Sequence, residues 1–172
     1  TSASSEEKLS ENTEIITQFN INKDKGLMRV TFQSNPYSIT TKSDGESLIE
    51  MENFGFILEP FHPMLPSKSF LLGLPPGATE LSIKVLNSKK ENIPGNFLIQ
   101  AAPPFSNGNE NNKIGGIIQP NMKSDIYSST EQYPNSAFKY LGLGQMRKYY
   151  FTKIRFCPIL YEPANGDLTL IK

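Results

Sequence analysis

The sequence predicts an all-β domain, either an antiparallel β-sandwich or an open barrel. Thirteen prolines and twelve glycines divide the 172 residues into short apolar stretches, which recur at intervals of about 8 to 12 residues as strands and turns do. No segment keeps apolar residues at i, i+3, i+4 and i+7 over three helical turns. Antiparallel strands with one buried face need a second sheet to cover them, and this requirement leads to a sandwich or an open barrel.

The strands follow from the apolar stretches in order. The clearest is Leu81–Val85, where apolar and polar side chains alternate so that one face can pack on a core. Asn165-Gly166 is a pair favoured in tight hairpins, and it predicts a turn between two strands near the C-terminal end. The predicted strands before that hairpin are Glu14–Ile21, Leu27–Phe32, Tyr37–Thr41, Ser47–Met51, Gly55–Leu58, Ser69–Leu74 and Glu80–Leu86.

The chain is predicted to form one domain with a polar leader. Thr1–Glu14 is rich in serine and glutamate, cannot bury enough apolar area to offset the ordering of its backbone, and is interpreted as mobile. Residues 15–172 then form a single β domain, because the length leaves little room for a second one. The polar, asparagine-rich stretch Pro103–Ser129 interrupts the strand rhythm, and a loop of that length is usually functional or disordered.

Composition argues against several classes of partner. Lysine plus arginine equal aspartate plus glutamate at 17 each, so no net charge attracts the chain to nucleic acid or to an anionic membrane. No run of about 18 apolar residues is present to insert into a bilayer.

No cofactor or metal site is expected. Cys157 is the only cysteine and His62 the only histidine. The two could form a thiol nucleophile with its base, but both lie beside prolines, so we interpret Cys157 as a core or edge-strand residue and His62 as a turn residue. The acidic residues lack the spacing of a calcium loop. Leu141-Gly142-Leu143-Gly144 lacks the spacing of a phosphate loop and instead favours a tight turn or a bulge.

An aromatic and basic cluster lies near the C-terminal end. Tyr149-Tyr150-Phe151 is flanked by arginines and lysines, which is the composition of a platform for single-stranded nucleic acid. The zero net charge favours the simpler interpretation of a strand, with Tyr149 and Phe151 on one face and Lys148 and Tyr150 on the other. The basic members of the cluster are Arg147, Lys148, Lys153 and Arg155.

A series of motifs covers roughly Phe54–Lys172. Pro63-Met64-Leu65-Pro66 precedes an apolar stretch that ends in Leu74-Pro75-Pro76-Gly77-Ala78, and the series continues with Tyr133-Pro134, Gly144-Gln145-Met146-Arg147 and Pro158-Ile159-Leu160-Tyr161-Glu162-Pro163-Ala164-Asn165-Gly166-Asp167-Leu168. In order and approximate spacing this series resembles the propeptide domains of gingipain-type cysteine endopeptidases. The motifs consist of turn and strand residues, so no catalytic role is carried over from them.

The resemblance implies the N-terminal prodomain of a secreted bacterial zymogen. Such a domain assists the folding of a cysteine protease catalytic domain, expected to follow Lys172, and blocks its active site with a loop. The candidate loop is Phe105–Ser129, with Lys113 or Lys123 as the side chain in the specificity pocket. The resemblance also implies a secreted or periplasmic location and a signal peptide that has been removed. Leu168–Lys172 predicts a strand that either pairs with a further strand or lies near a processing point.

Two alternatives remain at this stage. The first is a carbohydrate-binding or adhesive β-sandwich module, in which Tyr127, Tyr133 or Tyr149 would stack on sugars. The absence of tryptophan, which has the largest stacking surface, disfavours this alternative. The second is a free-standing enzyme, which a single histidine without a paired acid constellation makes hard to sustain.

Overall fold

A computed structural model describes residues 19–22, 27–76, 84–86, 88–104 and 125–172. Over these residues the fold is all-β, as predicted, with one 3-10 helix and no α-helix. The elements in chain order are β1 Phe19–Asn22, β2 Leu27–Val30, β3 Tyr37–Thr41, β4 Glu46–Met51, β5 Gly55–Phe56, β6 Pro66–Leu74, β7 Lys90–Ile93, β8 Leu98–Ile99, η2 Asp125–Ser128, β9 Phe138–Met146, β10 Tyr149–Phe156, β11 Ile159–Glu162 and β12 Asp167–Ile171.

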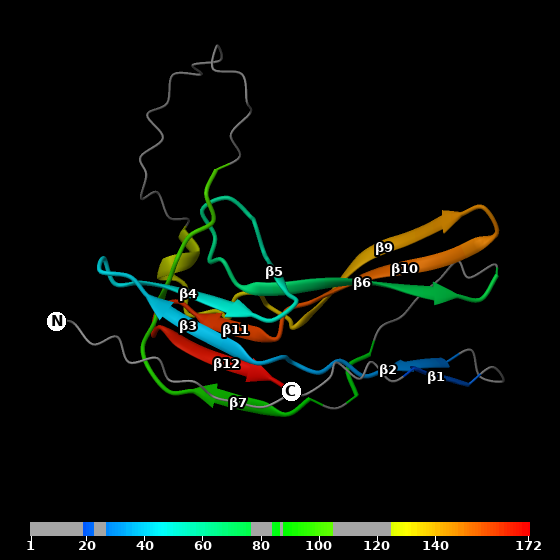
Figure 1. Cartoon of the computed structure of the whole chain (residues 1–172), viewed down its shortest axis with the longest axis horizontal. Helices are drawn as coiled ribbons and strands as arrows, with labels where there is room; N and C mark the ends of the chain where they lie inside the picture. Colours follow the sequence, from blue (N-terminus) through cyan, green and yellow to red (C-terminus); the bar gives the residue numbers. More distant parts are fainter. Residues whose placement is uncertain (1–18, 23–26, 77–83, 87, 105–124) are drawn as a thin grey trace, which may run out of the picture.

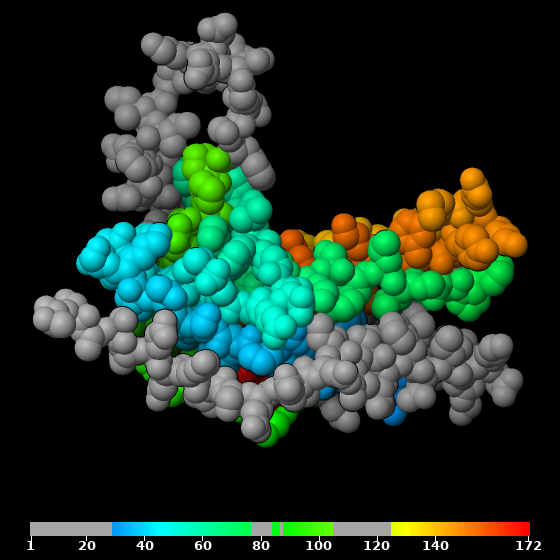
Figure 2. Space-filling view, in the orientation of Figure 1, coloured from blue at the N-terminus to red at the C-terminus, as the bar shows by residue number. Residues whose placement is uncertain are grey.

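The described strands form four sheets and no closed barrel. Their orders are β1-β2, β5-β6-β10-β9, β11-β12-β7 and β3-β4-β8. Every pairing is antiparallel except β4 with β8. In Figure 1 the two three-stranded sheets lie together on one side of the molecule, while β6, β9 and β10 extend away from them. The space-filling view in Figure 2 shows these three strands as an arm of green and orange atoms.

The principal core lies between the two three-stranded sheets. Ile49 of β4 and Ile99 of β8 are fully buried and belong to one cluster with Ile159 and Tyr161 of β11. A second cluster contains Leu160 together with Phe70 of β6, Phe138 of β9 and Phe156 of β10. Because alternate residues of β11 point into different clusters, this strand is covered on both faces, which explains its apolar run Ile159–Tyr161.

Most predicted strands are confirmed, with shifted ends. Strand β3 begins and ends where it was predicted, and β6 begins at Pro66 rather than Ser69. The prediction of a strand over Glu80–Leu86 is wrong for its described part: Lys84–Leu86 is in no strand, and Val85 is half exposed. Alternation permits a strand but does not supply a partner, and the position beside β6 is occupied by β10. Residues 80–83 and the leader 1–14 lie outside the described residues.

Two glycines with positive φ shape the turn between β11 and β12 and the bulge in β9. The turn predicted between two strands at Asn165-Gly166 is present: it is the four-residue turn Pro163–Gly166, which connects β11 and β12. Only Gly166 of that pair has a positive φ, +71°. Asn165 instead donates from Nδ2 to Glu162 Oε1 at 2.9 Å, an interaction that favours the wider turn. The bulge expected near Leu141–Gly144 is present: the pairing of β9 with β10 shifts by one residue there, and Gly142 has φ +123°.

Candidate functional site

The only cysteine and the only histidine do not form a catalytic pair. Cys157 follows the end of β10, is 2 % exposed and packs in the principal core. Burial raises the pKa of its thiol to about 11, so at neutral pH the sulfur stays protonated. A nucleophilic cysteine needs the opposite shift, because the thiolate is the reactive form. Cys157 is therefore a structural residue, as the sequence suggested.

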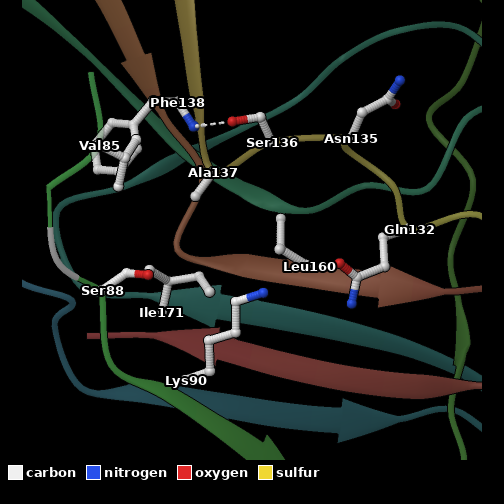
Figure 3. A pocket seen from close by; sticks show the side chains of 10 residues that line it. All are labelled: Val85, Ser88, Lys90, Gln132, Asn135, Ser136, Ala137, Phe138, Leu160 and Ile171. Carbon is white, nitrogen blue, oxygen red and sulfur yellow. Dashed lines mark hydrogen bonds between the residues drawn. The ribbon is translucent and has the colours of Figure 1, made fainter. Parts of the chain in front are cut away.

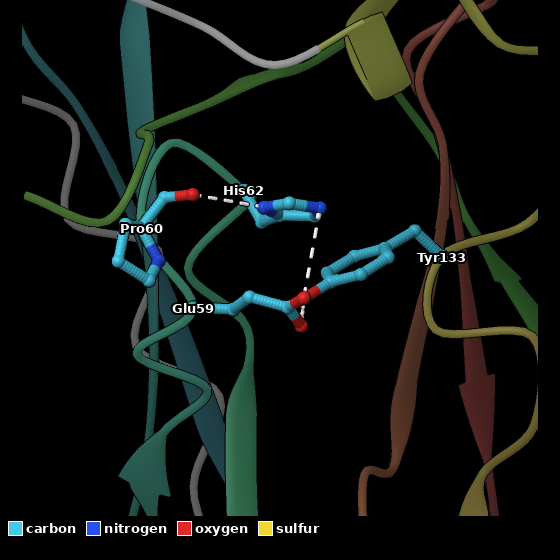
Figure 4. Close-up of polar contacts among 4 residues, drawn as sticks. All are labelled: Glu59, Pro60, His62 and Tyr133. Carbon is cyan, nitrogen blue, oxygen red and sulfur yellow. Dashed lines mark hydrogen bonds and ion pairs between the residues drawn. The ribbon is translucent and has the colours of Figure 1, made fainter. Parts of the chain in front are cut away.

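His62 belongs to a different cluster, drawn in Figure 4 with Glu59, Pro60 and Tyr133. Its Nδ1 lies 2.9 Å from the Pro60 carbonyl oxygen, and since a carbonyl only accepts, Nδ1 carries the proton and donates it. Its Nε2 lies 3.8 Å from Glu59 Oε1, and its ring centroid lies 5.6 Å from that of Tyr133. These contacts fix the turn after β5, and none of them presents a nucleophile to the imidazole.

A small hollow between β7 and the segment before β9 offers no catalytic groups. Its volume is about 180 Å³. Figure 3 shows Gln132, Asn135 and Lys90 at its edge and the apolar side chains of Ala137 and Leu160 deeper inside. Its lining contains one cation and no carboxylate or imidazole. The described part of the chain also contains no group of three histidine, cysteine, aspartate or glutamate side chains placed to hold a metal ion.

Two of the three tyrosines proposed for sugar stacking are occupied elsewhere. Tyr133 is 7 % exposed and pairs through its backbone with Tyr161. Tyr127 is partly buried, and its hydroxyl donates to the Ile99 carbonyl at 2.8 Å. Burial raises the pKa of both phenols. Only Tyr149, which is 63 % exposed, can offer a ring face to a ligand, so the carbohydrate alternative loses most of its predicted site.

The polar stretch Pro103–Ser129 is hydrogen-bonded to the core near both of its ends. On the upstream side the Ala102 amide donates to the His62 carbonyl and the Phe61 amide to the Ala102 carbonyl, at 2.8 and 2.9 Å. On the downstream side η2 is tied to the upstream flank by the bond from Tyr127 to Ile99. The Ala164 amide also donates to the Ser129 carbonyl at 3.1 Å. Both flanks of residues 105–124 are thus held on the core, whereas Lys113 and Lys123 lie outside the described residues.

In the described residues the fold is all-β, and the only cysteine is buried in the principal core. A family model described as Propeptide_C25 matches residues 8–172, nearly the whole chain. The chain belongs to this family, the propeptides of C25 cysteine peptidases. No curated protein sequence matches the chain.

Two solved structures from Porphyromonas gingivalis have a similar fold. A complex of the RgpB pro- and mature domains matches with a TM-score of 0.71 and 17 % identity, covering 90 % of this chain and 80 % of that one. A structure on the zymogenic latency of gingipain K matches with a TM-score of 0.64 and 15 % identity, covering 84 % of this chain and 81 % of that one. The gingipain-type resemblance inferred from the motifs is therefore confirmed.

Proposed function

We propose that this prodomain keeps a gingipain-like cysteine peptidase inactive by placing the segment Phe105–Ser129 in the active-site cleft, and that it assists folding of the catalytic domain. Lys113 or Lys123 would occupy the specificity pocket. The observation that carries the proposal is the attachment of both flanks: Ala102 on one side and Tyr127 on the other are hydrogen-bonded to the core. A loop whose ends are fixed in advance loses less conformational entropy on binding.

The similar structures support a partner of this kind. One is a complex of pro- and mature domains, and the other concerns the zymogenic latency of gingipain K. The partner would be the catalytic domain encoded after Lys172. Peptidases with propeptides of this family are secreted, and we place this chain in the periplasm or outside the cell with its signal peptide removed. In the described residues no helix is long and apolar enough to cross a membrane. Residues 15–172 would act as one domain and residues 1–14 as its leader.

The test is a titration of the purified domain against that catalytic domain, following hydrolysis of a peptide substrate. The parent domain should abolish activity at a one-to-one ratio. Lys113→Ala combined with Lys123→Ala should weaken inhibition by at least about 30-fold, since a desolvated anchor contributes about 2 kcal/mol or more. Asn111→Ala with Asn112→Ala, in the same segment, is the matched control and should inhibit like the parent. Equal inhibition by the lysine variant would refute the role of these anchors.

A further inference from the structure

The charges of this neutral chain are separated between its sheets. Strand β6 and the β9–β10 hairpin, Pro66–Leu74 and Phe138–Phe156, contain six basic residues and no acidic one: Lys68, Lys139, Arg147, Lys148, Lys153 and Arg155. The segment Tyr37–Glu59, which includes β3 to β5, has the opposite balance, with Lys42 against Asp44, Glu46, Glu50, Glu52 and Glu59. The arm therefore carries a local positive charge that the total of zero conceals.

One face of the arm collects half of these basic residues. Thr152, Ile154 and Phe156 of β10 are buried, so the alternate residues of β10 point to the opposite face. The strand register adds neighbours from β9 and β6 to that opposite face, because residues paired across a sheet share a face. We call it the basic face and define it by Leu71, Lys139, Met146, Tyr149, Lys153 and Arg155.

The basic residues on this face lack acidic partners within the described chain. Lys139 lies directly opposite Arg155 in the β9–β10 ladder, an arrangement of like charges that destabilises a sheet. Arg155 Nε is buried without a hydrogen-bond partner. The ion pairs of the described residues involve neither of these side chains nor Lys153. The fold thus keeps three cations together at some cost, which a second molecule with carboxylates would offset.

The same face also exposes apolar side chains. Met146, Leu71 and Tyr149, at 67 %, 65 % and 63 % exposure, are the most exposed large apolar side chains among the described residues. The Phe151 ring lies against Gly144 and fills the space that an added Cβ would take. An added Cβ at Gly73, which pairs with Phe151, would meet nothing within 4 Å. The missing side chain of Gly73 therefore leaves room for a group of a docking partner.

We propose that the basic face docks on an acidic, partly apolar surface of the catalytic domain, as a second contact besides the inhibitory segment. This role presupposes the inhibitory function proposed above. A protein fits the face better than single-stranded nucleic acid does, because Leu71 and Met146 offer no rings for stacking and Tyr149 is the one strongly exposed ring on the face. Exposed cations around an apolar centre speed encounter with an acidic partner and fix its orientation.

The experiment compares two charge-reversal variants of the whole chain. Lys139→Glu with Lys153→Glu changes the basic face, and Lys84→Glu with Lys90→Glu makes the same change in net charge at exposed positions outside the arm. The rate constant for onset of inhibition is measured at about 50 mM and about 500 mM salt, where surface charges are weakly and strongly screened. The face variant should associate at least about tenfold more slowly at low salt and lose most of the salt dependence. The control should stay within about twofold of the parent.

A second variant tests the apolar part without altering charge. Leu71→Ala with Met146→Ala should raise the dissociation rate by about tenfold or more, because both side chains become buried on docking. Both positions are exposed, so thermal unfolding should match that of the parent.

If the parent inhibits and both face variants inhibit equally well, the proposed docking role of the basic face is wrong and the inhibitory function stands. If the parent fails to bind the catalytic domain, both proposals fall. Tighter binding of a single-stranded oligonucleotide than of the catalytic domain would overturn the choice of a protein partner.

Discussion

Replacing Gly166 by alanine tests how the β11–β12 turn is held on the core. Gly166 has φ +71° and is buried, and its carbonyl accepts a hydrogen bond from the Phe97 amide at 2.9 Å. An added Cβ would lie 2.6 Å from Asn96 Oδ1 and 2.9 Å from the Phe97 nitrogen. The second contact is with backbone, so the segment Asn96–Phe97 has to move away and the hydrogen bond to Phe97 weakens.

The chain offers a matched control for the backbone strain alone. Gly45, in the turn between β3 and β4, has φ +84°, and an added Cβ there would meet nothing within 4 Å. The left-handed conformation costs alanine about 1–2 kcal/mol, and reduced freedom of the unfolded chain offsets about 0.4–1 kcal/mol of that. Gly45→Ala should therefore cost about 1 kcal/mol. Gly166→Ala should cost about 2–3 kcal/mol, because a hydrogen bond worth about 1 kcal/mol and tight packing are lost as well.

Equilibrium unfolding in urea measures both variants under the same conditions. With a slope of about 1–3 kcal/mol per molar urea, the extra loss in Gly166→Ala appears as a clearly lower midpoint than that of Gly45→Ala. Equal midpoints for the two variants would refute the reasoning, since they would mean that the contact with Asn96–Phe97 contributes nothing beyond the conformation of the turn.

Three further predictions concern buried groups. Burial raises the pKa of the Cys157 thiol to about 11 from its ordinary value of 9.0, so its contribution to stability is complete below pH 9 and is lost as the pH rises towards 11. The free energy of unfolding should fall by about 2 kcal/mol more between pH 8 and 10.5 in the parent than in Cys157→Ala. Parallel pH profiles of the two proteins would contradict this. Tyr127→Phe, which removes the bond to Ile99, should lower the free energy of unfolding by about 1 kcal/mol and weaken inhibition; unchanged inhibition would show that the flanks need no such tie. Leu65→Ala, at a fully buried position in the principal core, should cost about 2–5 kcal/mol in chemical denaturation, and a loss under about 1 kcal/mol would place Leu65 outside the packed core.

The sequence predicts the fold best where local chemistry and pairing agree. Strand β3 is predicted as a short apolar stretch between turns, and it pairs with β4 along its whole length. The predicted strand around Val85 shows the clearest alternation, yet the part that the structure describes has no ladder partner. Pairing depends on which distant strand reaches a given sheet edge, and a single sequence does not contain that information in a local pattern.

Of the two candidate surfaces, the sequence predicts the polar insertion but not the basic face. The long polar insertion is evident from composition, whereas the aromatic and basic run around Tyr149 favours an ordinary strand when only the sequence is considered. The missed signal was the lack of any acidic residue in two separate segments, Pro66–Leu74 and Phe138–Phe156. Only the register of β6 on β10 brings Leu71 beside Lys153, so the shared face could be recognised only in the folded chain. The carbohydrate alternative places Tyr133 on the surface, and its neighbours in sequence are polar, but the structure buries it.

The hydrogen bond between Tyr127 and Ile99 spans 28 positions of sequence and closes a ring of chain around the insertion. The entropy of closing such a ring grows only with the logarithm of its length, so doubling the length costs about 0.6 kcal/mol. The insertion can therefore be shortened, lengthened or exchanged for another sequence while its base and the β scaffold stay the same. Under the inhibitory role proposed above, a new segment grafted between the same two anchors would adapt the prodomain to a peptidase of different specificity.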